Sequence, residues 1–144
     1  MRVALALGAA MIASGGCHPD DTGAVLLHFT QRVDMPSTLT TFSSSTAAVA
    51  FSPDGPVLFT ATSSQGTLRL VLAGPLVDGA TIGLPADEER VRFELDGAAW
   101  GNQGGTVVVL SANPAIVRLA GVPMVARDGG AAGSFVFDGA GTFR

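Results

Sequence analysis

The chain has 144 residues and a formal net charge of −4, with 19 glycines, one cysteine and eight basic residues, all arginine. This acidic balance argues against nucleic-acid binding, which depends on clustered Lys and Arg opposite phosphates, and against electrostatic adhesion to an anionic membrane surface. A single cysteine excludes an internal disulfide framework, and the length is that of one ordinary domain.

Residues 1–16 predict a secretory signal peptide. Arg2 gives a positive start, residues 3–13 are an uncharged apolar run, and small residues occupy positions 14–16. The apolar run is shorter than the about 20 residues that a bilayer-spanning helix needs. We therefore expect the chain to be exported and this segment to be removed.

Residues 12–17, Ile-Ala-Ser-Gly-Gly-Cys, resemble the lipobox of bacterial lipoproteins, although Ser14 stands where that family usually has Leu. In the family a peptidase cuts before the cysteine after a lipid has been attached to its sulfur. The resemblance implies that Cys17 is lipidated and holds the protein on a membrane. It also implies the outer membrane, because His18 stands where Asp would signal retention in the inner membrane.

Two alternatives stay open at Cys17. Ser14 and Gly16 also satisfy the small-x-small rule of ordinary signal cleavage, which would leave a periplasmic or secreted protein with a free N-terminal cysteine. A lone cysteine could also be an incidental free thiol or form an intermolecular bridge.

The rest of the chain has the pattern of short strands separated by turns. In residues 25–30 apolar and polar side chains alternate, which is the period of a half-buried strand. Turn signals recur at Ser52-Pro53-Asp54-Gly55 and at the hairpin dipeptide Asp96-Gly97. Further strands are expected over residues 38–42, 46–51, 57–62, 67–73, 90–95, 106–110, 116–126 and 133–137.

This pattern predicts an all-β fold. We expect a signal peptide over residues 1–16, a lipidated N-terminus and tether over 17–23, and a single-domain antiparallel β-sandwich over 24–144, with a β-barrel as the alternative. One core is expected to contain Phe29, Leu70, Phe93, Val107 and Phe135.

Two segments interrupt the strand pattern. Pro and acidic residues over 85–89 are typical of a helix start, so one helical turn is expected before the strand that begins at Arg90. Pro123 cannot donate to a ladder and belongs on an edge or at a bulge, which we place near Gly121.

The sequence offers little chemistry for catalysis. The predicted domain has one histidine, His28, which the strand pattern places on a solvent face, and the common hydrolase and zinc-protease motifs are absent. The acids of residues 87–89 could serve a carboxylate-dependent hydrolase or a hard cation. Consecutive acids in an extended chain seldom converge, so we favour a solvated loop, with no catalytic residues, metal or cofactor.

Trp100, Asn102 and Gln103 form a candidate ligand-binding group. An aromatic ring with amides nearby can hold a sugar, whereas a lone Trp in a small β domain also commonly fills the core. Residues 100–107 and 133–139 resemble segments of small β-rich bacterial lipoproteins of unassigned function. Together these features predict a lipid-anchored envelope protein that is a binding or structural module. The alternatives are a secreted carbohydrate- or surface-binding module and the carboxylate-dependent hydrolase.

Overall fold

The computed structural model describes residues 23–35 and 37–144, and these residues form ten β-strands and no helix. The all-β prediction is therefore confirmed. In chain order the strands are β1 (Gly23–Val33), β2 (Thr41–Ala50), β3 (Val57–Ser63), β4 (Gly66–Leu72), β5 (Thr81–Gly83), β6 (Val91–Leu95), β7 (Ala98–Asn102), β8 (Thr106–Ala112), β9 (Ala115–Asp128) and β10 (Ser134–Phe143).

Eight of these strands close into an antiparallel barrel. The order around the ring is β10-β1-β2-β3-β4-β6-β7-β9, and pairing of β9 with β10 closes it. β8 pairs with the first half of β9, and β5 pairs with β8. This closure confirms the β-barrel alternative in place of a two-sheet sandwich.

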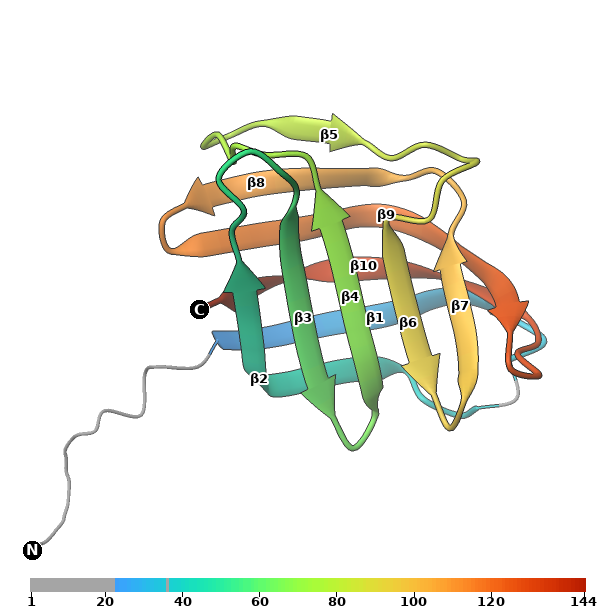
Figure 1. The fold of residues 1–144 in the computed structure, drawn as a ribbon. Coiled ribbons are helices and arrows are strands. Elements are labelled where there is room, and N and C mark those ends of the chain that lie inside the picture. Colours follow the sequence, from blue (N-terminus) through green and yellow to red (C-terminus); the bar gives the residue numbers. More distant parts are fainter. Residues whose placement is uncertain (1–22, 36) are drawn as a thin grey trace, which may run out of the picture.

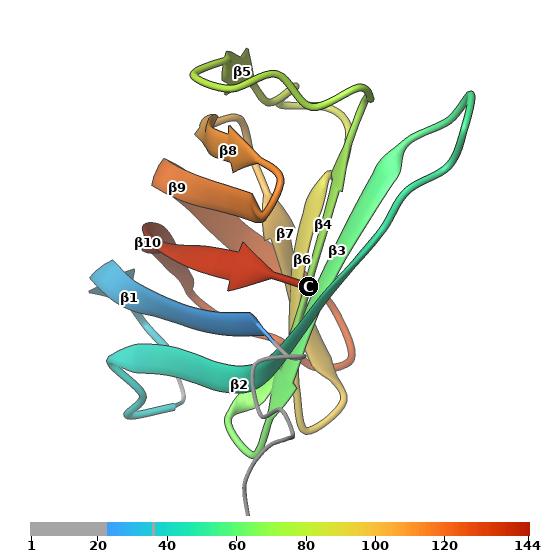
Figure 2. The ribbon, with the colours of Figure 1, turned by 90° about the vertical axis from the view of Figure 1, so that its left-hand side faces the viewer.

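Two long strands carry the sheet around the corners of the barrel. β2 pairs with β1 through its first part and with β3 over residues 47–50. β9 likewise pairs with β8 over residues 115–119 and with β7 over 124–128. As a result β3, β4, β6 and β7 run steeply across β1, β8, β9 and β10 (Figures 1 and 2).

The expected break between two strands near residues 43–45 is wrong, because β2 continues through them. These three serines look like a turn in the sequence. In the fold the Ser44 hydroxyl is buried and donates a hydrogen bond of 2.7 Å to the carbonyl oxygen of Thr62. A satisfied hydroxyl is compatible with a strand interior, so the polar run does not end the ladder.

The bulge predicted near Gly121 is confirmed. Gly121 has φ +70°, and the pairing of β9 with β10 shifts register between Phe137 and Asp138, opposite this position. Pro123 lies where one edge of β9 changes partner from β8 to β7, and its carbonyl oxygen accepts a hydrogen bond from the Gln103 amide. The missing N–H of Pro123 therefore falls between the β8–β9 pairing and the β7–β9 pairing and interrupts neither of them.

The region around β6 and β7 combines a confirmed prediction with an error. Asp96 and Gly97 have φ of +51° and +83°, as a two-residue hairpin turn requires, and they connect β6 to β7. The strand β7 itself was not among the expected strands. The helical turn predicted over residues 85–89 is wrong, because this segment is an irregular connection between β5 and β6.

Aromatic side chains fill the barrel interior. The five predicted core residues are all confirmed, each 5% exposed or less: Phe29, Leu70, Phe93, Val107 and Phe135. The Phe93 ring makes edge contacts with Phe29, Phe42 and Phe137 at centroid distances of 5.4 to 5.5 Å. An eight-stranded barrel encloses just enough space for side chains or one small ligand, and here the side chains occupy it.

Candidate functional site

A groove with a volume of about 1000 Å³ lies outside this core. Its lining comes from four segments that are distant in the sequence, and we call it the end groove: residues 51–57, residues 71–76 without the buried Leu72, residues 88–90, and Ala112. A second hollow of about 670 Å³ shares Phe51 and Ala112 with it and extends to Phe143 and Arg144. The two hollows therefore adjoin each other at Phe51 and Ala112.

Apolar and proline side chains dominate the walls of the end groove. The chain leaves β2 at Phe51, which is 60% exposed, and turns back through Ser52-Pro53-Asp54-Gly55. The Gly55 amide bonds the Ser52 carbonyl oxygen, which is the turn predicted from the sequence. An exposed aromatic ring at the rim of a concave, apolar surface is a common feature of ligand sites.

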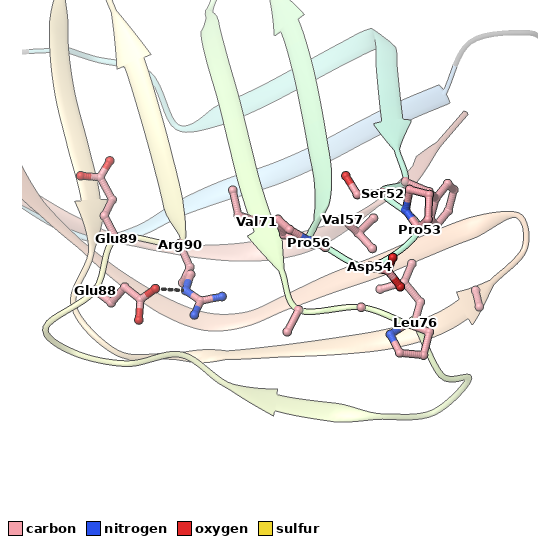
Figure 3. A pocket seen from close by; sticks show the side chains of 16 residues that line it. Ser52, Pro53, Asp54, Pro56, Val57, Val71, Leu76, Glu88, Glu89 and Arg90 are labelled. Atoms are coloured by element: carbon pink, nitrogen blue, oxygen red, sulfur yellow. Dashed lines mark ion pairs between the residues drawn. The ribbon is translucent and has the colours of Figure 1, made fainter.

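Arg90 and Glu88 form the opposite wall from Asp54 and Leu76 (Figure 3). The Arg90 Nε lies 2.8 Å from a carboxylate oxygen of Glu88. Two backbone hydrogen bonds fix the main chain at Arg90: its amide donates to Asn102 Oδ1 at 2.6 Å, and its carbonyl accepts from the Val71 amide at 2.8 Å. The arginine therefore projects from a rigid base.

Asn102, predicted as a ligand-binding residue, holds the loop before β6. It is fully buried, and its Oδ1 accepts hydrogen bonds from the amides of Arg90 and Val91. Its Nδ2 donates to the carbonyl oxygens of Pro85 and Glu88 at 3.1 and 3.4 Å. Because these four bonds use the whole hydrogen-bonding capacity of the amide, Asn102 is a positioning residue for the Arg90 wall.

The sugar-binding interpretation of Trp100 is wrong. The indole is 1% exposed and donates Nε1–H to the Ala132 carbonyl oxygen. It lies in tilted contact with the Phe93 ring and in edge contact with the Phe135 ring. Neither face of the ring is open for stacking, because β7 places Trp100 opposite Phe93 inside the barrel. Gln103 lies exposed after the end of β7 and does not join a site with the ring.

Arg92 forms ion pairs with three carboxylates on the outer face of β6. Its guanidinium contacts Glu94 at 2.7 Å, and Glu89 and Asp128 at 3.1 Å each. The hydrogen bonds to Glu94, Glu89 and Asp128 raise the pKa of Arg92 above its ordinary value, against a smaller opposing effect of desolvation. Glu89 also borders the end groove, but its carboxylate contacts Arg92 on the outer face of β6.

The remaining candidates lie on the surface. His28 is exposed on β1, as predicted, and residues 87–89 form the expected exposed acidic loop. Glu88 and Glu89 contact different arginines, Arg90 and Arg92. Within residues 23–35 and 37–144, no cluster of three His, Cys, Asp or Glu side chains is arranged to hold a metal ion.

Cys17, the predicted lipidation site, and His18 lie outside the described residues. In the described part of the chain no helix is long and apolar enough to cross a membrane. Comparison with protein-family models, with curated proteins and with solved structures found no match to this chain. The end groove is thus assigned from its geometry alone.

Sequence reasoning missed the end groove. The turn at residues 52–55 was predicted, but nothing local to it indicates that it faces residues 88–90. One signal was present: Phe51, Pro53, Pro56 and Pro75 place apolar side chains in connections that would otherwise be polar.

Proposed function

We propose that this chain is an exported envelope protein, anchored by a lipid on Cys17, whose barrel is a binding module for an apolar ligand. The end groove is the binding site. The observation that carries the proposal is an apolar groove with an exposed Phe51 at its rim, on a barrel whose interior is already full. Clefts of about 300–1,000 Å³ are typical of small-molecule sites.

The position of the first strand supports a site close to the membrane. Gly23 pairs with Ala47, and Ala47 accepts a hydrogen bond from the Arg144 amide beside the second hollow. Figure 2 shows the start of β1 and the C-terminus on one side of the barrel. Residues 17–22 span at most about 20 Å when extended. A lipid on Cys17 would therefore keep this side of the barrel near the bilayer. We propose that this bilayer is the outer membrane.

Neither alternative function has comparable support. A carbohydrate-binding module was predicted to depend on an exposed Trp100, and that ring is in the core. A carboxylate-dependent hydrolase needs two acids that face one substrate bond, whereas Glu88 and Glu89 are each paired with a different arginine. We therefore propose a binding role without catalysis.

Replacing Phe51 with serine tests the site. The neutral fluorescent probe phenylnaphthylamine is expected to bind the full chain carrying Cys17→Ser, measured as enhanced emission in a titration. Phe51→Ser should weaken this binding by about tenfold, because the change removes the largest exposed apolar surface in the groove.

Leu26→Ser is the matched control, since Leu26 is 48% exposed on β1 and does not line the groove. Equal loss of probe binding in the two variants, or no binding by the parent, would rule out the end groove as an apolar site.

A further inference from the structure

Arg90 has hydrogen-bond donors that its neighbours leave open. Its Nε is buried and lies 2.8 Å from Glu88, but the N–H is not aligned with that carboxylate, and the atom has no hydrogen-bond partner in the described residues. Within residues 23–35 and 37–144, its two terminal nitrogens have no hydrogen bond either. A guanidinium offers five N–H donors in a planar fork suited to carboxylates.

The open side of the guanidinium is turned toward the end groove. Figure 3 shows the Arg90 Nε directed at Glu88 and one terminal nitrogen turned toward the wall that carries Asp54 and Leu76. The side chain is 27% exposed, so the terminal nitrogens are accessible but partly shielded from water. A charge-assisted hydrogen bond is stronger in such a setting than on an open surface.

Three carboxylates border the same groove, and their positions decide whether Arg90 can accept another anion. Glu89 is held by Arg92, and Asp54 lies on the opposite wall. Glu88 is the direct competitor. It is 56% exposed, and the contact of 2.8 Å that it makes with Arg90 is at Nε and not at the terminal edge of the guanidinium.

We propose that the end groove takes a single-chain amphiphile with a terminal carboxylate, and that Arg90 binds the carboxylate through its two terminal nitrogens. This inference rests on the proposed function, because it names the ligand class of the same groove. The apolar chain lies along the wall that includes Phe51 and Leu76, and the carboxylate lies at the Arg90 end. The groove volume of about 1000 Å³ is in the range of small-molecule sites, which favours a small ligand over a macromolecular partner.

The base of this site is rigid before any ligand arrives. Asn102 and Val71 fix the Arg90 main chain on both sides, through the amide and the carbonyl oxygen. The main chain at Arg90 therefore needs no further ordering on binding, which lowers the entropic cost of recognition at this end of the groove.

The test compares decanoate with decanol, which has the same chain length but no charge, by calorimetry and by displacement of phenylnaphthylamine from the full chain carrying Cys17→Ser. Decanoate is expected to bind about tenfold more tightly than decanol, through the charge-assisted hydrogen bonds. Arg90→Gln should remove this preference, because it should weaken the binding of decanoate much more than the binding of decanol. Glu88→Gln should strengthen decanoate binding, because it removes the competing carboxylate.

Arg69→Gln is the control, since Arg69 is exposed on β4 and does not line the groove. Equal affinity for decanoate and decanol, or equal weakening of both ligands by Arg90→Gln, would overturn the inference while leaving an apolar groove intact. Failure of phenylnaphthylamine to bind would overturn the proposed function. Calorimetry detects decanoate without the probe, so absence of decanoate binding overturns the inference by itself.

Discussion

Replacing Phe93 with alanine is expected to lower the free energy of unfolding by about 3–5 kcal/mol. The ring is fully buried at the centre of the aromatic cluster, where truncation leaves a cavity that the surrounding strands cannot collapse into. Its ring neighbours come from β1, β2, β7 and β10: Phe29, Phe42, Trp100, Phe135 and Phe137. The measurement is urea denaturation followed by circular dichroism.

Phe51→Ala is the matched control, because the same chemical change is made at a ring that is 60% exposed. We expect it to change the free energy of unfolding by less than about 1 kcal/mol. A Phe93→Ala protein as stable as the parent would mean that β6 does not turn this ring into the barrel.

Replacing Cys17 with serine is expected to abolish attachment to the membrane. Several acyl chains hold a protein firmly, whereas a single chain holds it only marginally, and the lipoprotein pattern supplies a diacylglyceryl group on the cysteine sulfur. Serine lacks the thiolate that takes the lipid, and the chain has no second cysteine. The parent should therefore stay with washed membranes, while the variant should retain its signal peptide or behave as a water-soluble exported protein.

Mass spectrometry of the parent's N-terminus measures the same point directly, because a lipidated Cys17 has a defined added mass. Circular dichroism of the variant should match that of the parent, since the strands of the described residues begin at Gly23, after the substituted position. An unmodified thiol at Cys17, or a mature chain that starts after it, would contradict the proposed lipid anchor.

Period-two alternation was sufficient to predict most of the barrel strands. Val25, Leu27 and Phe29 face inward from β1, because a strand with one buried face must alternate in this way. The same pattern cannot distinguish a sandwich from a barrel. Closure depends on β2 and β9 each pairing with different strands along their length, and pairing between distant segments leaves no local signal.

The errors have particular causes. β7 has little alternation to detect, because Ala99, Trp100, Gly101 and Asn102 are all buried in succession. Gly101 is covered from outside, since a Cβ there would lie 2.8 Å from Arg127 Nε. Pro85 and the acids of residues 87–89 are typical of a helix start, whereas in the fold Asn102 supplies hydrogen bonds that shape this segment.

The prediction of a ligand site at Trp100 and Asn102 is wrong for one reason. Their residue types are common in ligand sites, but both side chains are buried and cannot reach a ligand. Both side chains find their hydrogen-bond partners inside the protein, through the Ala132 carbonyl oxygen for Trp100 and the loop before β6 for Asn102. The end groove could not be predicted, because it needs the turn after Phe51 and the Arg90 wall to meet across the end of β4.

The most direct test of the end groove as the binding surface is a titration followed by amide proton–nitrogen correlation spectra. The full chain carrying Cys17→Ser is titrated with phenylnaphthylamine, and each backbone amide reports the change around it. We predict that the shifted amides cluster over residues 51–57, 71–76 and 88–90, with little change on the outer faces of β1 and β10. Shifts confined to those outer faces, or spread evenly over the barrel, would contradict the assignment of the end groove.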